Sequence, residues 1–214
     1  MALVVYNPPL LKEFHDSERT FNFSGLQPIT ICQDWGNNGV AAVVWEAAIV
    51  LASYLLNMSS DIKGRNVLEL GAGTGLTGIV VALLNANVTL TDQFEALEPL
   101  YINTKKNLNS NLHFYQVKEL SWGEKLKTAW AHESYDYIIG ADLVYIESAL
   151  PALVATFEHF MEINRNLIII LAGKVRYTHK YEKFKKLLQI SFVSSEVFIN
   201  EDNVYILRIV CKKK

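Results

Sequence analysis

Three acidic residues and one glycine-rich turn are the parts of this sequence whose types and spacing could do chemistry. The turn is E-L-G-A-G-T-G at residues 69–75, which follows the apolar pair V-L and precedes L-T-G-I-V. This order predicts a strand, a tight turn and a helix start. Because glycine has no Cβ, such a turn can approach a ligand closely, and the helix N-terminus behind it offers unpaired N–H groups. The segment is therefore predicted to bind a cofactor that carries a nucleoside.

The glycines fit two motifs. G-x-G-x-x-G at residues 73–78 matches the dinucleotide fingerprint, but that motif needs its first glycine directly after the strand, and here this position is Gly71. The pattern acidic-x-Gly-x-Gly-x-Gly uses all three early glycines, makes Glu69 face the ligand, and is the S-adenosylmethionine pattern. A carboxylate suits a cofactor with an ammonium and a sulfonium group and would repel a pyrophosphate. The methyl donor is favoured; a dinucleotide-dependent oxidoreductase and a turn needed only for helix packing remain as alternatives.

Asp92 is the second acidic residue. It ends the β-branched run V-T-L-T-D at residues 88–92, about 20 residues after the glycine turn. A βαβ unit places its ribose-binding carboxylate at this distance from the glycines. Asp92 is therefore predicted to accept the ribose hydroxyls, and the alternative is a cap on the helix that follows.

Asp142 is the third, in A-D-L-V-Y at residues 141–145, after the predicted strand 135–140. Ligands of open α/β sheets lie beyond the carboxyl ends of the strands, so Asp142 and Tyr145 are predicted beside the transferred methyl group. Amino-group methyltransferases that act on nucleic acids often carry Asn/Asp-Pro-Pro-Tyr there. The similar N-P-P-L at residues 7–10 is far from this strand and is interpreted as a coincidence. A helix-capping role is the alternative for Asp142.

An alternation of strands and helices must position these residues. Strands are predicted at 67–70, 88–91, 112–117, 135–140 and 167–172, and helices at 77–84, 96–108, 150–161 and 177–188. Such alternation favours a parallel sheet with helices on both faces. Strands at 192–199 and 204–211 form an antiparallel hairpin through a short turn. The fold class is therefore α/β: the Rossmann-like, seven-stranded methyltransferase fold, mostly parallel, with a C-terminal antiparallel hairpin and a short N-terminal extension.

The N-terminal part is predicted to be a small hairpin of strands 19–23 and 29–32, followed by an apolar helix over 39–58. This helix is close to the length of a membrane span, but it contains Glu46 and several alanines that suit packing on a sheet. It is therefore predicted to be buried. Without a linker or repeat, residues 1–60 are expected to pack on the cofactor-binding core 61–214 as one domain, 1–214.

The composition limits the partners. The chain has 214 residues and a net charge of −2, which provides no general attraction to nucleic acids or anionic membranes. Cys32 and Cys211 lie apart and lack metal-binding spacing, as expected of reduced intracellular thiols. No secretion signal is recognised. We expect a cytoplasmic monomer without metal, nucleic-acid or membrane ligands.

Several motifs together resemble the methyltransferase-like protein-lysine methyltransferases. They are D-L-V-Y at 142–145, the glycine turn, Q-D-W at 33–35, G-V-A-A-V-V-W-E-A-A at 39–48, E-L-S-W-G at 119–123 and the opening M-A-L-V. The resemblance covers nearly the whole chain. It implies cofactor contacts by Trp45, Gly71, Ala72, Gly73, Asp92, Trp122 and Ala141. The chain departs from the pattern at Glu46, where Asp is expected, and at G-N-N, residues 36–38, where basic and bulky residues are expected.

The resemblance also implies the reaction, which is transfer of a methyl group from S-adenosylmethionine to a lysine of a protein. In it, Asp142 would orient the lysine head and Tyr145 would line its channel and accept a hydrogen bond. The sequence looks most similar to the member that methylates seventy-kilodalton heat-shock chaperones. Members that act on a hexameric AAA ATPase or on elongation factors share the same motifs, and a non-catalytic adaptor of this fold is a further alternative.

Overall fold

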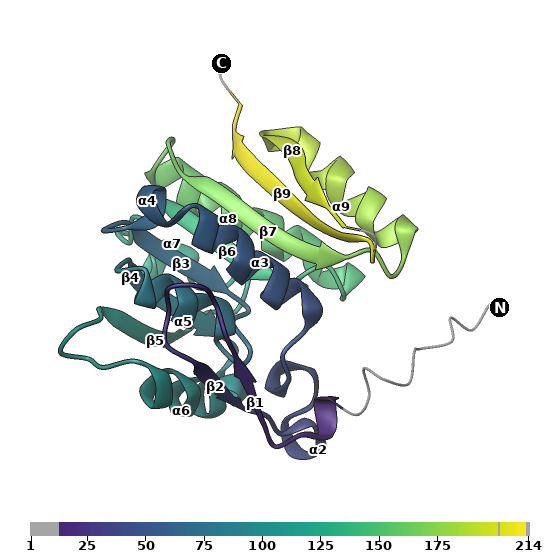
Figure 1. The fold of residues 1–214 in the computed structure, drawn as a ribbon. Helices are drawn as coiled ribbons and strands as arrows, with labels where there is room; N and C mark the ends of the chain where they lie inside the picture. The colour runs from purple at the N-terminus through teal and green to yellow at the C-terminus, as the bar shows by residue number, and fades with distance from the viewer. Residues whose placement is uncertain (1–12, 201, 213–214) are drawn as a thin grey trace.

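A seven-stranded sheet forms the centre of the protein (Figure 1). The computed structural model describes residues 13–200 and 202–212. The order of the strands is β5-β4-β3-β6-β7-β9-β8, and all neighbours are parallel except β9, which is antiparallel to β7 and to β8. The strands are β3 (Asn66–Leu70), β4 (Asn87–Asp92), β5 (Tyr115–Glu119), β6 (Tyr137–Ala141), β7 (Ile168–Lys174), β8 (Phe192–Ile199) and β9 (Val204–Cys211). The predicted fold class, with its terminal hairpin, is confirmed.

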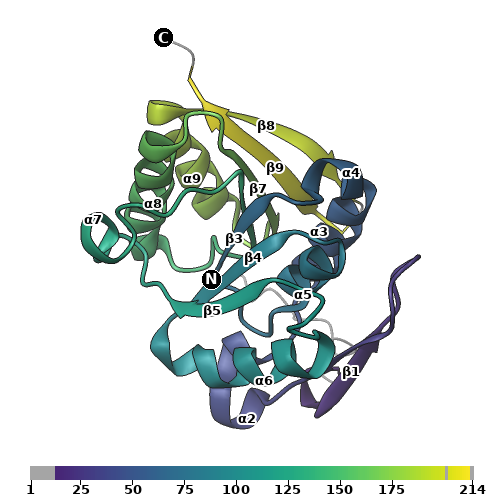
Figure 2. The same ribbon diagram turned by 90° about the vertical axis from the view of Figure 1, so that its left-hand side faces the viewer.

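Helices cover both faces of this sheet (Figure 2). One face carries α3 (Glu46–Asn57), α4 (Ser59–Ile62), α5 (Leu76–Leu83) and α6 (Leu97–Asn107), and the other carries α7 (Leu126–Ala129), α8 (Leu150–Ile163) and α9 (Thr178–Ser191). Shorter elements are α2 (Trp35–Asn38) and the 3-10 turns η1 (Gly39–Ala42), η2 (Phe94–Ala96) and η3 (Glu147–Ala149).

The central strands are apolar on both sides because each face has its own core. In β6, Ile138 packs against the α8 and α9 side, whereas Ile139 packs against the α3 and α5 side, and both are fully buried. Successive side chains of a strand point to opposite faces, which explains the continuous apolar run in the sequence. The order of strands reverses between β3 and β6, and the carboxyl ends of these two strands therefore border the crevice where ligands bind in such sheets.

The structure corrects the helix predicted over residues 39–58. The segment forms η1, then an extended stretch, and only from Glu46 onward the helix α3. The side-chain oxygen of Gln33 accepts the backbone N–H of Val44 at 2.9 Å, so this donor is bonded outside the segment. Trp45, with ψ at 150°, is the extended residue before the helix. Among the described residues, no helix is long and apolar enough to cross a membrane.

The strand predicted at 112–117 is also shifted. Leu112 lies in a turn, in which the carbonyl of Asn109 accepts the N–H groups of Leu112 and His113, and β5 begins only at Tyr115. The side chain of Leu112 is exposed, so its apolar character does not mark a core position here. The N-P-P-L motif at residues 7–10 and the opening M-A-L-V lie outside the described residues.

The N-terminal hairpin of β1 (Glu18–Phe21) and β2 (Ile29–Cys32) is held by an asparagine of α6. Asn103 is 1% exposed, and its side-chain oxygen accepts the Cys32 N–H at 2.8 Å. Its amide nitrogen donates to the carbonyls of Cys32 and Thr74, both at 3.1 Å. One buried side chain thus joins β2, α6 and the glycine turn.

Asn103→Ala is expected to lower the free energy of unfolding by about 2–3 kcal/mol, because it leaves buried backbone groups without partners. Urea denaturation measures this change. The exposed Asn111, in the turn before β5, provides the matched control, and Asn111→Ala is expected to stay within about 0.5 kcal/mol of the wild type. Equal stability of the two variants would contradict the anchoring role of Asn103.

Candidate functional site

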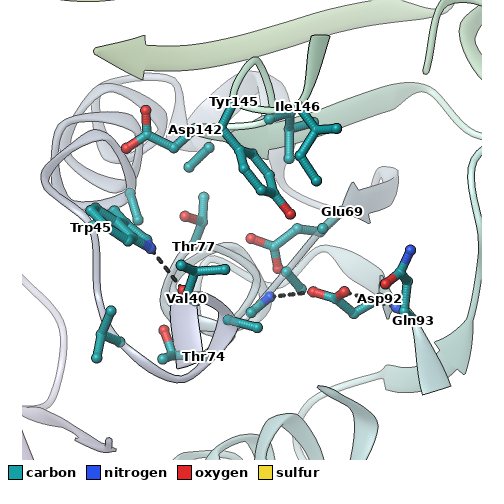
Figure 3. Close-up of a pocket in the computed structure, with 18 of the residues that line it drawn as sticks. Val40, Trp45, Glu69, Thr74, Thr77, Asp92, Gln93, Asp142, Tyr145 and Ile146 are labelled. Carbon is teal, nitrogen blue, oxygen red and sulfur yellow. Dashed lines mark hydrogen bonds between the residues drawn. The ribbon is translucent and has the colours of Figure 1, made fainter. Parts of the chain in front are cut away.

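A cavity of about 280 Å³ opens beyond the carboxyl ends of the parallel strands, where the strand order reverses (Figure 3). All ten residues that the sequence analysis proposed for the site line it: Trp45, Glu69, Gly71, Ala72, Gly73, Asp92, Trp122, Ala141, Asp142 and Tyr145. They come from five separate parts of the chain. The fold therefore brings every predicted site residue to one place.

The glycine turn after β3 is closed against two other segments. Gly71 and Gly73 have φ angles of +57° and +53°, which residues with a Cβ rarely adopt. A Cβ on Gly71 would lie 2.7 Å from Leu143 Cδ2, and one on Gly73 would lie 2.9 Å from the backbone oxygen of Ala41. The N–H of Gly73 donates to Asp92 Oδ2 at 2.8 Å. The turn thus requires glycine both for its backbone angles and for its contacts.

Glu69 lies on the floor of the cavity and is 2% exposed. Its Oε2 accepts the N–H of Gly78 at 3.0 Å, in the first turns of α5. A Cβ on Gly78 would collide with this carboxylate, so the last glycine of the G-x-G-x-x-G match serves the packing of helix on strand. Burial is the main cause that raises the pKa of Glu69 to about 8, and the charge of Asp92 adds to it. The hydrogen bond from Gly78 lowers this pKa and offsets part of the effect of burial.

Asp92 ends β4 next to this floor. Besides the bond from Gly73, its Oδ1 accepts the N–H of Gln93 at 2.8 Å. Burial raises the pKa of its carboxyl group, whereas these two backbone bonds lower it. The helical turn that follows has no side-chain cap. Asp92 therefore does not cap the helical turn that follows it.

Asp142 lies after β6 with a φ of +55° and forms an ion pair that the sequence analysis missed. Its Oδ1 accepts Arg176 Nη1 at 3.0 Å and its Oδ2 accepts Arg176 Nη2 at 3.1 Å. Oδ1 also accepts the backbone N–H of Lys174 at 3.0 Å. The turn before α8 has no side-chain cap, so Asp142 does not cap a helix. One signal for Arg176 was available, because it follows a predicted strand at the same edge of the sheet.

Two aromatic side chains border the opening of the cavity from different elements. Trp45 Nε1 donates to the carbonyl of Val40 at 2.8 Å, and its ring faces the Arg176 guanidinium, whose carbon lies 5.0 Å from the ring centroid. Tyr145 projects into the cavity with its hydroxyl toward Glu69 and Asp92 (Figure 3). Burial raises the pKa of Tyr145, and the charge of Asp92 adds to this. The cavity thus has a carboxylate floor and an aromatic rim.

The sequence analysis did not propose several other lining residues. They include Val40, Thr77, Leu143, Ile146 and Arg176. Val40 was missed because its segment was expected to be a regular helix. Glu46, which stands where Asp is expected, pairs with Lys174 at 2.7 Å. The side chains of residues 37 and 38 lie outside the described part of the structure.

The raised pKa of Glu69 makes a prediction for stability. The folded state holds the proton of Glu69 up to about pH 8, whereas the group has an ordinary pKa of 4.5. The folded state therefore binds more protons between these pH values, and its stability falls as the pH rises through this window. Glu69→Gln cannot lose a proton and keeps an acceptor for Gly78.

Urea unfolding of the protein between pH 5 and pH 9 measures this effect. We expect the stability of the wild type to decline relative to Glu69→Gln as the pH rises to 8, and the difference to level off above it. Glu95→Gln, at an exposed position two residues after the lining residue Gln93, is the control and should follow the wild-type profile. Parallel profiles of the wild type and Glu69→Gln would rule out a buried, protonated Glu69.

Solved structures of methyltransferases have the same fold. Magnesium protoporphyrin IX methyltransferase from Synechocystis PCC 6803 with bound SAH matches with a TM-score of 0.57 and 16% identity, over 77% of this chain and 81% of that chain. The T. thermophilus 16S rRNA N2 G1207 methyltransferase, in complex with AdoMet and guanosine, matches with a TM-score of 0.67 and 19% identity, over 91% of this chain and 50% of that chain. At this identity the likeness concerns the fold.

Relatives with curated names are much more similar in sequence. Protein N-lysine methyltransferase METTL21A of Danio rerio is 42% identical over 218 residues, which cover all of this chain and 98% of the relative. METTL21A of Xenopus tropicalis is 40% identical over 97% of this chain and 96% of the relative. EEF1A lysine methyltransferase 3 of Xenopus tropicalis is 38% identical over 92% of this chain and 87% of the relative.

The family model described as "Lysine methyltransferase" matches residues 25–190, a range that contains all ten predicted site residues and Arg176. The identity to the curated relatives supports the same family. The structure is consistent with it, because residues of the Asp-Leu-Val-Tyr motif and of the glycine turn line one cavity. The chain belongs to the lysine methyltransferase family, with the fold of S-adenosylmethionine-dependent methyltransferases.

Proposed function

We propose that this chain transfers a methyl group from S-adenosylmethionine to the side-chain nitrogen of a lysine in a protein substrate. The observation that carries the proposal is that a carboxylate floor and the Asp142–Arg176 pair line one cavity beyond the sheet. The floor suits a cationic cofactor, and the pair lies where an acceptor can enter. A cytoplasmic monomer that acts on protein and not on nucleic acid is part of the same proposal.

The residues present fit this cofactor. A buried carboxyl group, Glu69, lines the cavity and holds its proton in the empty site up to about pH 8. An ammonium or sulfonium group beside it favours the ionised form, because opposite charges attract most strongly where water is excluded. Oδ2 of Asp92 accepts the N–H of Gly73 and Oδ1 accepts that of Gln93, and each oxygen can accept a second hydrogen bond from a ribose hydroxyl. Because Gly71 and Gly73 lack a Cβ, the turn can pack directly against Leu143 and Ala41, which also line the cavity. We therefore assign the site to S-adenosylmethionine, held by Glu69, Asp92, Trp45, Gly71, Ala72, Gly73, Trp122 and Ala141.

The bound cofactor supplies a methyl group on a cationic sulfur, ready for attack by a nucleophile. The remaining chemistry is that of the acceptor nitrogen, which must be neutral. A free lysine has a pKa near 10.4, so its deprotonation at pH 7 costs roughly 4–5 kcal/mol. Apolar walls such as Val40 and Ile146 lower this cost, because desolvation disfavours the ammonium form.

Asp142 and Tyr145 orient the acceptor in this proposal. Each carboxylate oxygen can accept two hydrogen bonds, and Oδ2 of Asp142 accepts one from Arg176. It can therefore receive an N–H of the lysine while the ion pair stays intact. The ring of Tyr145 walls the channel, and its hydroxyl offers a further acceptor. Alignment of the nitrogen then supplies much of the rate.

For the substrate we propose a seventy-kilodalton heat-shock chaperone, on the basis of the motifs in the sequence. The METTL21A relatives, at 40–42% identity, match a larger share of this chain than EEF1A lysine methyltransferase 3 does. The latter relative makes elongation factor 1A the second candidate. An AAA ATPase has support from the shared motifs alone.

Labelled S-adenosylmethionine tests this function. The purified protein is incubated with a cell extract, and in parallel with a purified seventy-kilodalton chaperone and with elongation factor 1A. We expect label on a lysine of the chaperone, identified by mass spectrometry. Label on elongation factor 1A alone would correct the substrate. Label on RNA or small molecules alone would overturn the protein-lysine proposal.

Calorimetry with S-adenosylmethionine and with NAD separates the remaining alternatives. We expect binding of S-adenosylmethionine only. Binding of NAD in its place would indicate a dinucleotide enzyme, and binding of S-adenosylmethionine without any labelled product would indicate an adaptor.

Two alanine variants are expected to act in opposite ways. Asp142→Ala should lower methyl transfer by about 100-fold or more, since the acceptor loses its alignment, and change the cofactor Kd only a few-fold. Asp92→Ala should weaken cofactor binding by about tenfold or more, because ribose acceptors are lost. Asp202→Ala, at the exposed hairpin turn, is the control for both measurements. A comparable loss of both properties in Asp142→Ala would make Asp142 structural.

A further inference from the structure

Arg176 holds a permanent positive charge against the carboxylate of Asp142. Its guanidinium forms two parallel hydrogen bonds to Asp142, at 3.0 and 3.1 Å, and it also faces the ring of Trp45. The Asp142 side chain is 10% exposed and that of Arg176 is 32% exposed. Bidentate pairs of this kind have a defined geometry, and at this low exposure water screens them only in part. Arg176 lines the same cavity as the predicted cofactor residues.

An unpaired Asp142 would create a chemical conflict at the acceptor site. A carboxylate beside a lysine favours the ammonium form and raises the pKa of that lysine, but only the neutral amine can act as a nucleophile. The ion pair with Arg176 has no net charge. It keeps an oxygen of Asp142 available to the N–H groups of the acceptor without leaving an uncompensated negative charge there.

We propose that Arg176 is a positioning residue that offsets the charge of Asp142, so that the acceptor lysine loses its proton near neutral pH. This inference rests on the proposed methyl transfer to lysine. When the N–H bond of the ammonium breaks, the electron pair remains on the nitrogen and the proton passes to water. Arg176 also holds Asp142 in its left-handed backbone conformation, through both carboxylate oxygens.

The other charged groups near this pair do not replace Arg176. Lys174 reaches Asp142 only through its backbone N–H, because its side chain pairs with Glu46 at 2.7 Å. Lys180 donates to the backbone oxygen of Tyr145 at 2.9 Å. On the cofactor side of the cavity, a negative charge on Asp92 would strengthen the conflict, and so would one on Glu69 once it has lost its proton.

The two charges of the pair have opposite effects on the pKa of Tyr205, on β9. Burial is the main cause that raises the pKa of its hydroxyl, the charge of Asp142 raises it further, and the charge of Arg176 lowers it. The guanidinium therefore opposes the field of the carboxylate at a neighbouring proton-binding group. A lysine ammonium beside Asp142 would experience the same two effects.

The pH dependence of kcat tests the inference, since kcat reports proton equilibria in the enzyme–substrate complex. The full-length protein is assayed with saturating S-adenosylmethionine and with the purified chaperone or elongation factor that the wild type labels. We expect Arg176→Gln to move the acid limb of the kcat profile upward by about one pH unit or more. Arg176→Lys keeps the charge, so its acid limb should stay near that of the wild type even if its rate is lower.

Lys180→Gln is the matched control, because it removes a neighbouring cation whose described bond goes to Tyr145 and not to Asp142, and its acid limb should not move. Asp142→Asn is a second test of the same charge effect, and its result does not depend on whether Arg176→Gln folds. It leaves Arg176 uncompensated, so the acid limb of its residual activity should move in the opposite direction, to lower pH. Thermal melting and the calorimetric Kd for S-adenosylmethionine verify that each variant is folded.

The same loss of kcat at every pH in Arg176→Gln, or an unchanged profile in both Arg176→Gln and Asp142→Asn, would overturn the charge-offsetting role. The proposed function fails in a different way, because the wild type itself would then label no lysine. The two failures are therefore distinguishable in a single series of assays.

Discussion

The backbone contact between the glycine turn and the segment before α3 is the constraint on which the rest of the site depends. At Gly73 the chain passes so close to the backbone oxygen of Ala41 that no Cβ fits between them. In the same turn, the carbonyl of Thr74 accepts a hydrogen bond from the side chain of Asn103, and the N–H of Gly73 donates to Asp92. The N-terminal segment is therefore part of the cavity wall. Changes in this segment can affect ligand binding without any change in the sheet.

The cavity has two ends with different electrostatics. At the floor, the described hydrogen bonds of the acidic residues Glu69 and Asp92 come from backbone N–H groups and, for Glu69, from Thr77. Neither group has a cationic partner among the described residues, and Glu69 holds its proton up to about pH 8. At the rim, the carboxylate of Asp142 is paired with Arg176. A low local dielectric strengthens the electrostatic interactions at both ends of the cavity. The floor therefore favours a cation, whereas the rim can bind an N–H group with little preference for the charged form of the amine.

Local patterns were sufficient to predict the parts of the fold and site that depend on short segments. The strands that end at Leu70 and Asp92 are short apolar runs followed by a turn, and the carboxyl ends of parallel strands meet at one edge. This is why Glu69, Asp92 and Asp142 could be found from their positions alone. Trp45, Ala72, Trp122 and Ala141 were instead predicted from the family resemblance, and all ten predicted residues line one cavity. The missed features depend on partners that are distant in the sequence. Before α3, the side chain of Gln33 accepts the N–H of Val44, and this residue is not part of a helix. The apolar sequence of residues 39–58 does not predict this hydrogen bond. Arg176 pairs with a residue 34 positions earlier. In both places a contact between distant residues, and not the local pattern, decides the structure.

The rim is also where the specificity of this fold must arise. Structures with 16% and 19% identity share the fold, yet their names assign one to a magnesium porphyrin and the other to an rRNA base. Since the fold is common to such different acceptors, the acceptor is selected by residues that the fold does not fix. In this chain the rim residues Val40, Tyr145, Ile146 and Arg176 come from three separate connecting segments outside the sheet. Because such segments tolerate substitution better than the sheet, the rim can change its acceptor while the carboxylate floor stays the same.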